Sequence, residues 1–334
     1  KKSALSYLYN IHINDEYFFV KSYQVHYFMQ FDRNGKFLRQ IGAIGRGPKE
    51  YLLCIDFTVN ETTKEIIIRD NWNHHLYFYD YNGVFQKKMN VSVYAVDIIS
   101  LSTGEIVCSA GQNWGNPMSF MLLGYDNKGD TTFIKKNWFY KKSYQATAFY
   151  SNRIFSNNDS VFYNEFFGDT IYLYNSRSMV PYYILKWDKF KDPAVFNMTA
   201  YGRKEILENM AKVFQPKLFQ STPGYLYIYY KYHFNNNLGR FNKKTWEIVF
   251  YEGVKELGCM KNDFDGGITV NPKFDAGNNK WVAELPADSL IRTLTPEYFA
   301  KSKAMYPGKR EKLKKLVENL KENDNPVIMI ITLK

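Results

Sequence analysis

The sequence predicts an all-β protein, a six-bladed β-propeller of four-stranded antiparallel blades with two short helical insertions. Three observations lead to this prediction. Phe, Trp and Tyr make up 18% of the chain, a density typical of β-sheet proteins. A strand–turn–strand motif with the turn Asp-x-x-Gly recurs along the chain. Its clearest copies are 48 and 46 residues apart, which is about the length of one propeller blade.

The repeated hairpin is clearest at the turns Asp32–Gly35, Asp80–Gly83 and Asp126–Gly129. The aspartate carboxylate can cap such a turn, and the glycine takes the left-handed conformation that a short hairpin loop needs. Degenerate copies with asparagine in place of aspartate follow at Tyr172–Asn175 and Leu238–Asn242. Two further strand-like runs precede each hairpin, so the repeat predicts blades of four strands.

The second blade shows the complete set of strands. They are expected at Leu52–Val59, Glu65–Asp70, Leu76–Asp80 and Val84–Met89. When the two helical stretches are left out, about 287 residues remain, enough for six blades of about 48 residues. Seven blades would need repeats shorter than those observed.

Two stretches, near 193–212 and 296–322, have helical rather than strand-like patterning. Thr295 suits the N-cap of the second, and Pro296 suits its first helical position. We expect a single propeller domain over residues 1–334. Its last blade is expected to combine a C-terminal strand at 327–332 with N-terminal material, because closure removes exposed sheet edges.

Composition limits the class of protein without identifying a ligand. The net charge of +11 suits an acidic partner. The three cysteines, Cys54, Cys108 and Cys259, are too scattered for a disulfide framework or a zinc site, so we expect buried free thiols. No run of about 18 apolar residues occurs, so no membrane-spanning helix is predicted. The chain begins at Lys1 without a hydrophobic signal segment, and we expect its targeting information upstream.

The segment Ile66–Gly83 resembles an NHL repeat, which reads as an apolar strand, Asp, a short loop with Asn-His, a second apolar strand and Asp-x-x-Gly. Gly42–Tyr51 looks like the Gly-rich blade connection of the same superfamily. Together with Asn262–Gly267 and Leu320–Val327, these motifs are similar to the six-bladed propeller lipoproteins of Bacteroidetes envelopes. The resemblance covers essentially the whole chain.

This resemblance implies a periplasmic or surface-exposed lipoprotein of the cell envelope. Its signal and its lipid-modified cysteine would precede Lys1, and this lipid would be its only attachment to a membrane. We expect the protein to be a monomer.

Strand order predicts which loops share a face of the propeller. The connection from an outer strand to the next inner strand opens on the same face as the loop between second and third strands. The Arg46 loop, the Asp263–Gly267 loop and the loops that hold His26, His74 and His233 are therefore expected to surround one channel mouth.

Arg46 lies in Gly45-Arg46-Gly47-Pro48, where a guanidinium could clamp a carboxylate, sulfate or phosphate. This is not a dinucleotide fingerprint, because a strand rather than a helix follows. The alternative is that Arg46 pairs with a neighbouring blade. Asp263 and Asp265 could ligate Ca²⁺, but no glutamate closes the loop at EF-hand spacing, so a self-capped turn is favoured.

His26 and His74 are 48 residues apart, one repeat length, and His233 falls in the corresponding loop of another blade. Histidines from separate blades can bind a metal in a propeller channel. However, Asn-His is also the ordinary loop sequence of the repeat, and no acidic partner recurs beside these residues. We therefore expect no metal and no other cofactor.

Lys21, Arg69 and Lys231 also occupy matching positions, just before that loop. Together with Trp72 they predict a basic and aromatic rim. Such a rim could bind an acidic glycan, a peptide carboxylate or single-stranded nucleic acid, since stacking and positive charge serve all three. The alternative is a solvated rim of long cationic side chains.

The sequence lacks His-Glu-x-x-His, Gly-x-Ser-x-Gly, phosphate-binding Gly-Lys-Ser/Thr and Cys-x-x-Cys motifs, and nothing nominates a nucleophile. We therefore expect a non-catalytic binding or scaffold protein that takes an acidic glycan or peptide on one channel face. One alternative is a metal-dependent lyase or hydrolase acting in the channel. The other is nucleic-acid binding through a basic NHL-type face, which an envelope location would disfavour.

Overall fold

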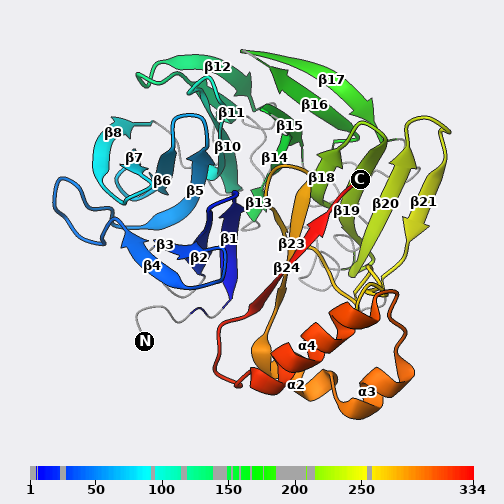
Figure 1. The fold of residues 1–334 in the computed structure, drawn as a ribbon. Coiled ribbons are helices and arrows are strands. Elements are labelled where there is room, and N and C mark those ends of the chain that lie inside the picture. The colour runs from blue at the N-terminus through cyan, green and yellow to red at the C-terminus, as the bar shows by residue number, and fades with distance from the viewer. Residues whose placement is uncertain are drawn as a thin grey trace. The chain divides into compact units, whose positions relative to one another are not determined.

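The computed structural model describes residues 5, 7–22, 28–91, 95–113, 119–137, 149–151, 153–157, 159–165, 168–175, 177–185, 208, 215–253 and 258–334. Within these ranges the chain forms 24 β-strands and three helices, which are drawn in Figure 1. The strands form six antiparallel sheets. The fold class is the six-bladed β-propeller that the sequence predicts.

Four of the sheets contain four strands in chain order, and each sheet is one blade. The first is β1 (Leu8–Ile13), β2 (Tyr17–Ser22), β3 (Phe28–Asp32) and β4 (Phe37–Ile41), and the second is β5 (Cys54–Asn60), β6 (Glu65–Asp70), β7 (His75–Asp80) and β8 (Phe85–Asn90). The fourth is β14 (Arg153–Asn157), β15 (Ser160–Asn164), β16 (Thr170–Asn175) and β17 (Ser178–Ile184), and the fifth is β18 (Gln215–Ser221), β19 (Tyr225–Tyr232), β20 (Asn235–Asn242) and β21 (Ile248–Tyr251).

The third and sixth sheets differ from this pattern. The third contains β9 (Ala95–Ser100), β10 (Ile106–Asn113), β11 (Phe120–Tyr125) and β12 (Thr131–Lys136), and β13 (Phe149–Ser151) pairs with the far end of β10. In the described residues the sixth contains three strands, β22 (Phe274–Asp275), β23 (Lys280–Leu285) and β24 (Val327–Thr332).

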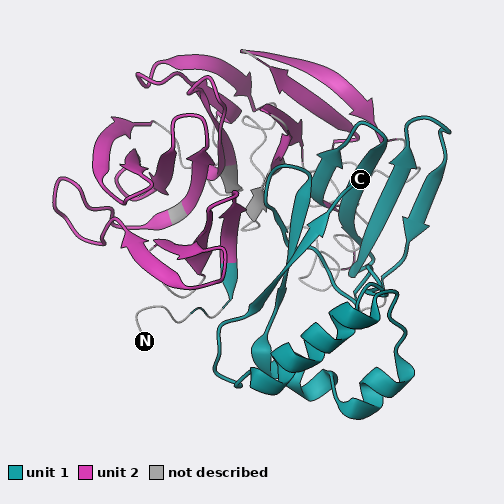
Figure 2. Cartoon of the chain, in the orientation of Figure 1, with its two compact units in different colours: residues 1–8, 217–334 teal, residues 9–216 magenta. Residues whose placement is uncertain are grey.

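The chain divides into two compact units, coloured separately in Figure 2. The larger unit, Tyr9–Pro216, holds the first four blades apart from the first residue of β1. The smaller unit combines Lys1–Leu8 with Lys217–Lys334, and it holds the three helices and the last two blades apart from the first two residues of β18.

The Asp-x-x-Gly turns have the geometry that the sequence predicts. After β7, Oδ1 of Asp80 accepts hydrogen bonds from the N–H groups of Asn82 and Val84, both at 2.9 Å. The glycine of this turn has φ of +80°, a left-handed conformation that glycine adopts at little cost. Asp32 and Asp126 each accept the same pair of bonds in their own turns. One local device therefore ends the third strand of three successive blades.

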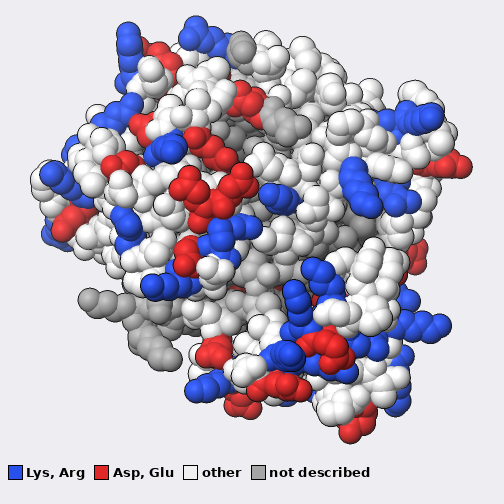
Figure 3. Space-filling model, viewed as in Figure 1, with Lys and Arg blue, Asp and Glu red and all other residues white. Residues whose placement is uncertain are grey.

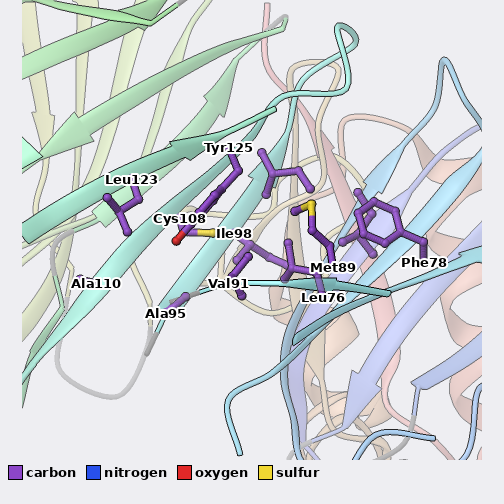
Figure 4. Packing of buried hydrophobic residues seen from close by; sticks show 12 residues of the cluster. Leu76, Phe78, Met89, Val91, Ala95, Ile98, Cys108, Ala110, Leu123 and Tyr125 are labelled. Atoms are coloured by element: carbon purple, nitrogen blue, oxygen red, sulfur yellow. The ribbon is translucent and has the colours of Figure 1, made fainter. Parts of the chain in front are cut away.

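The core of the larger unit includes the interface between the second and third blades. Figure 4 shows Leu76, Phe78 and Met89 of the second blade in one cluster with Ile98 and Cys108 of the third. Side chains alternate between the two faces of a strand, so every second residue reaches this interface. Full burial of each such apolar side chain stabilises the fold by roughly 1.5–3 kcal/mol.

All three cysteines are free and buried, as predicted. Burial raises the pKa of Cys54 and of Cys108 to about 12, and that of Cys259 to about 11. Since the thiolate is the nucleophilic form, these thiols are unreactive near neutral pH. In the described part of the chain, no helix is both long enough and apolar enough to span a bilayer.

The first predicted helical insertion, 193–212, lies outside the described residues apart from Glu208. The second corresponds to two helices, α3 (Pro296–Lys301) and α4 (Pro307–Asn319). A further helix precedes them, α2 (Ala287–Thr293), which the sequence analysis did not predict.

The continuous helix predicted over 296–322 is interrupted before Pro307. Proline disfavours the helical conformation in the residue before it, and Tyr306 is extended, with φ of −121° and ψ of 92°. The predicted N-cap is present, because the Thr295 side chain accepts a hydrogen bond from the N–H of Tyr298. Leu313, Val317 and Leu320 pack against residues of the α2 and α3 region, whereas Leu316 of α4 is exposed.

The last sheet contacts the N-terminal segment without receiving a strand from its described residues. The N–H of Leu8 donates to Glu284 at 2.7 Å, and the N–H of Leu5 donates to Asn325 at 2.8 Å. The strand that begins at Leu8, β1, pairs with β2 in the first sheet. The C-terminal strand β24 pairs with β23 along its whole length.

The hairpin between β19 and β20 turns through His233 and Phe234, which have φ of 48° and 64°. A two-residue turn with both residues left-handed is the type that favours Asn-Gly. For a residue with a Cβ atom, this left-handed conformation costs roughly 1–2 kcal/mol of conformational energy. The turn is therefore held by the sheet against its local preference.

Replacing His233 by Asn and Phe234 by Gly is predicted to raise the free energy of unfolding by about 1–2 kcal/mol. Urea denaturation followed by circular dichroism measures the change. Phe234→Ala alone is the control, because it removes the ring and keeps a Cβ atom at the left-handed position. If the double variant is no more stable than this control, the conclusion that the His233–Phe234 turn is strained is wrong.

Candidate functional site

Two loops of the second blade carry Arg46 and Trp72. Arg46 lies between β4 and β5, and Trp72 lies between β6 and β7. The buried carboxylate of Asp70 joins the two loops. It accepts a hydrogen bond from the N–H of Leu52 at 2.8 Å and another from the N–H of Trp72 at 2.9 Å. We call loops 42–53 and 71–74 together the Arg46–Trp72 face.

The loop that carries Arg46 is held in one conformation. The Glu50 carboxylate accepts a hydrogen bond from the N–H of Gly47 at 2.8 Å, and the N–H of Gly45 donates to the carbonyl of Tyr51 at 3.1 Å. A Cβ atom on Gly45 would lie 1.9 Å from Oε2 of Glu50, so a larger residue there would displace the Glu50 carboxylate. The loop is therefore formed before any ligand binds.

The Arg46 side chain is exposed, and it makes no hydrogen bond or ion pair with any residue that the structure describes. No described residue of a neighbouring blade pairs with Arg46, so the described structure does not support that alternative. Trp72 is 71% exposed. A guanidinium with unused donors can clamp a planar anion, and an indole can stack on a flat apolar surface.

Arg69 and Lys21 are buried rather than exposed on a rim. Arg69 is fully buried, and its Nη1 donates to the carbonyls of Asp70 at 3.1 Å and His75 at 3.3 Å. Lys21 is buried as well, with its ammonium 4.2 Å from the ring centroid of Tyr9. The interpretation of these two cations as part of an exposed rim is therefore wrong. A direct ligand contact by either one stays a prediction.

In the smaller unit, Asp265 caps its own turn. Its Oδ1 accepts hydrogen bonds from the N–H of Gly267 at 3.0 Å and from Nδ2 of Asn262 at 2.8 Å. The carbonyl of Asp263 accepts a hydrogen bond from the N–H of Met305 at 2.7 Å, which ties the loop to the α3–α4 connection. Across the described ranges, no three His, Cys, Asp or Glu side chains are grouped to hold a metal ion.

His74 and His233 lie in equivalent loops between the second and third strands of their blades. Both have left-handed backbones, with φ of 53° and 48°. His26 lies outside the described residues. The Lys231 ammonium is 5.9 Å from the ring centroid of Phe234, beside His233. In the described structure these loops are tight turns.

A buried polar cluster that the sequence analysis missed lies on the first strands of the first three blades. Oδ1 of Asp56 accepts a hydrogen bond from Nδ2 of Asn10 at 2.7 Å, and Oδ2 accepts one from the N–H of Ile98 at 3.1 Å. Burial raises the pKa of Asp56 to about 7, and the nearby charge of Asp97 adds to this effect. Burial also lowers the pKa of Lys21, while attraction to Asp56 opposes this.

The positions of this cluster follow the repeat. Asn10, Asp56 and Asp97 are each the third residue of the first strand of a blade, with a non-polar or aromatic residue on either side. This recurring third position is the sequence signal that could have identified the cluster. A polar residue that recurs inside apolar strands indicates a shared hydrogen-bond partner. The hydrogen bonds of Asp56 connect three neighbouring blades of the larger unit.

A family model described as a domain of unknown function, DUF4934, matches residues 1–332. No curated protein matches the sequence. A crystal structure of a Bacteroides fragilis protein, provisionally described as exported, is 19% identical with a TM-score of 0.75, and the match covers 100% of this chain and 93% of that one. At this identity the likeness shows the propeller fold alone.

Two further solved structures are less similar. A DUF4221 family member from Bacteroides vulgatus is 11% identical with a TM-score of 0.46, over 75% of this chain and 82% of that one. Streptogramin B lyase is 11% identical with a TM-score of 0.47, over 99% and 84%. Neither likeness bears on the function of this chain.

Asp70→Ala is predicted to lower the free energy of unfolding by about 2–4 kcal/mol, because N–H groups of two loops lose one shared acceptor that is itself fully buried. Asp80→Ala is the matched control. Its turn is exposed, so water replaces the carboxylate and the expected cost is about 1 kcal/mol. Urea denaturation of both variants measures the difference. Equal costs would show that Asp70 is no more than an ordinary turn cap.

The Asp56 carboxyl is predicted to make stability fall as pH rises from about 4 to about 7. Its pKa is near 4 in the unfolded chain and about 7 in the folded protein, so the folded state holds a proton that the unfolded state has lost. The Asp56→Asn variant should show a shallower decline, and above pH 7 neither slope should depend on this group.

Chemical denaturation across that pH range tests the prediction. Burial raises the pKa of Asp275 to about 7 as well, so this carboxyl supplies a remaining slope in the variant. Asp56→Asn and Asp275→Asn together should remove more of the slope than either alone. An unchanged slope in Asp56→Asn would contradict the assignment.

Proposed function

We propose that this chain, which belongs to the DUF4934 family because that family's model matches residues 1–332, is a non-catalytic ligand-binding protein of the bacterial cell envelope. Its ligand is an acidic glycan, bound on the Arg46–Trp72 face. The observation that carries the proposal is an exposed guanidinium that pairs with no described residue, and an exposed indole, on two loops that one buried carboxylate joins.

The rigidity of these loops favours binding. A flexible loop loses conformational freedom when it closes on a ligand, whereas a pre-formed loop has already lost it. Glu50 holds the Arg46 loop, and Asp70 joins it to the Trp72 loop. The binding energy is then available for the contacts themselves.

The residue types on this face match an acidic sugar. A guanidinium can donate two parallel hydrogen bonds to one carboxylate or sulfate. An exposed indole offers a flat apolar surface to the C–H face of a sugar ring. An acidic peptide would satisfy the guanidinium equally well, and it is the second ligand class that the experiment below includes.

The envelope location is part of the proposal. It is supported by the resemblance of Ile66–Gly83 and Gly42–Tyr51 to the NHL-like propeller lipoproteins of Bacteroidetes. The Bacteroides fragilis protein of the same fold is itself provisionally described as exported. A lipid anchor upstream of Lys1 would hold the propeller at a membrane.

The two other functions draw less support from the described residues. A metal-dependent lyase needs a ligand cluster, and the described residues contain no such group. Nucleic-acid binding through a basic face needs continuous positive charge. On the face drawn in Figure 3, basic and acidic side chains are interspersed.

Arg46→Ala and Trp72→Ala are each predicted to weaken binding of an acidic oligosaccharide at least tenfold, because each removes one half of the contact. Arg46→Lys should bind with intermediate affinity, since an ammonium cannot make the two-pronged contact. An array of acidic glycans and peptides identifies the probe, and isothermal titration calorimetry then measures affinity.

Arg33→Ala is the matched control, because Arg33 is an exposed arginine in the hairpin turn between β3 and β4. It should bind like the unmodified protein. Thermal unfolding confirms that each variant is folded. The proposal fails if no acidic glycan on the array binds, or if the protein cleaves or eliminates one of them.

A further inference from the structure

The outer strand of the fifth blade, β21, has an unusual sequence for a sheet edge. Its residues are Ile248, Val249, Phe250 and Tyr251, and all four are exposed. It pairs with β20 on one side and is the last strand of its sheet, as Figure 1 shows. Ile248 and Phe250 are 56% and 54% exposed. The backbone hydrogen-bonding groups on its outer side face no described strand.

Other outer strands of the protein carry residues that discourage pairing with another chain. Lysine, arginine and proline on an edge strand oppose such pairing, and natural proteins use them for that purpose. β21 has none of them. The outer strands of the first four blades all do: Arg39 in β4, Lys87 and Lys88 in β8, Lys135 and Lys136 in β12, and Pro181 in β17.

β24, the last strand of the sixth sheet, also lacks charged residues, but five of its six residues are partly buried. Among the described edges, the uncharged strand that is exposed at every position is therefore β21. An exposed apolar edge of this kind is either an aggregation hazard or a place where a partner binds.

The turn before β21 extends this apolar surface. Trp246 is 79% exposed, and its ring packs edge-on against Phe241 of β20 at 5.8 Å between centroids. Its backbone is left-handed, with φ of 62°, a conformation that costs a non-glycine residue energy. Oδ1 of Asn242 accepts hydrogen bonds from Lys244 and Thr245 and fixes the turn. A strained, fixed and exposed tryptophan beside an open edge points to a contact surface.

Charge at the two ends of β21 indicates what kind of partner fits. Glu247 precedes the strand and Glu252 follows it, and both are exposed. Glu252 makes no hydrogen bond or ion pair with any described residue, and Glu247 accepts a hydrogen bond from the Thr245 hydroxyl at 2.8 Å. A strand laid against β21 would therefore meet an apolar centre between two negative ends.

We infer that β21 binds an extended segment of a partner protein as an added fifth strand, and that this segment carries apolar residues between two basic residues. Backbone hydrogen bonds along the edge supply affinity, as in other complexes formed by strand addition. The carboxylates of Glu247 and Glu252 select the basic ends. This surface lies on the smaller unit and is independent of the ligand proposed for the Arg46–Trp72 face.

Two other occupants fit the charges less well. If two copies paired antiparallel through β21, Glu247 of one copy would lie opposite Glu252 of the other, and like charges directly opposite destabilise a pair of strands. An anionic lipid surface would be repelled by the same two carboxylates. A basic-ended peptide gains attraction at both ends.

Fluorescence anisotropy with three labelled peptides tests the inference. The first is Lys-Thr-Val-Tyr-Val-Lys, the second has glutamate at both ends, and the third is the lysine peptide with alternate backbone nitrogens methylated. The lysine peptide should bind saturably, the glutamate peptide at least tenfold more weakly, and the methylated peptide not measurably, because it cannot form the strand hydrogen bonds.

Three variants link binding to this edge. Val249→Lys places a charge in β21 and should abolish binding of the lysine peptide, whereas Ile134→Lys makes the same change at an exposed position of β12 and should not. Glu247→Gln with Glu252→Gln leaves the apolar edge intact. It should bring the affinities of the lysine and glutamate peptides to within threefold of one another.

The inference is overturned if the folded protein binds neither peptide, if both bind equally, or if Val249→Lys has no effect. It is also overturned if sedimentation velocity detects a dimer that Val249→Lys disrupts, since the occupant is then a second copy. Binding to phosphatidylglycerol vesicles that is lost in Val249→Lys would likewise replace the peptide by a lipid surface.

Discussion

Side-chain oxygens that accept hydrogen bonds from turn backbone are the interaction on which the repeated blades depend. In the second blade, Asn60, Asp70 and Asp80 end the first three strands at intervals of ten residues. Each accepts hydrogen bonds from N–H groups two or more residues ahead. A chain that reverses direction so often would otherwise leave these donors without protein partners, and buried ones are costly to leave unpaired. The same chemistry therefore sets strand length and register along the blade.

The candidate site depends on the same kind of hydrogen bond, from turn N–H groups to a side-chain oxygen. Among the described residues, the Asp80 side chain bonds only within its own turn, whereas Asp70 is buried and also accepts a hydrogen bond from Leu52, within the Arg46 loop. A residue that ends a strand thus also aligns a neighbouring loop. Arg69 adds support from below, by donating to the backbone on both sides of the Trp72 loop. The loops of the exposed Arg46 and Trp72 therefore depend on two buried side chains, Asp70 and Arg69.

Local chemistry made the strands and turns predictable, and burial was harder to predict. The four strands of the second blade were placed within two residues, because the Asp-x-x-Gly turns and apolar runs are local signals. Lys21 and Arg69 were misplaced on a rim, because matching positions in a repeat reveal equivalence and not exposure. Arg69 directly follows Ile66–Ile68, and its burial continues that apolar run. The α2 helix and the Asp56 cluster depend on contacts between segments distant in sequence.

Several structural features depart from the pattern of the repeat, and these are the places to look for function. A sequence that satisfies local preferences everywhere specifies a fold, and exceptions that persist need another reason. Arg46 has no partner among the described residues, Trp246 and the His233–Phe234 turn adopt left-handed backbones, and β21 lacks the charges carried by several other outer strands. Two of these features cost conformational energy, which the surrounding blade must offset. The binding proposed for the Arg46–Trp72 face and for β21 would account for two of these departures.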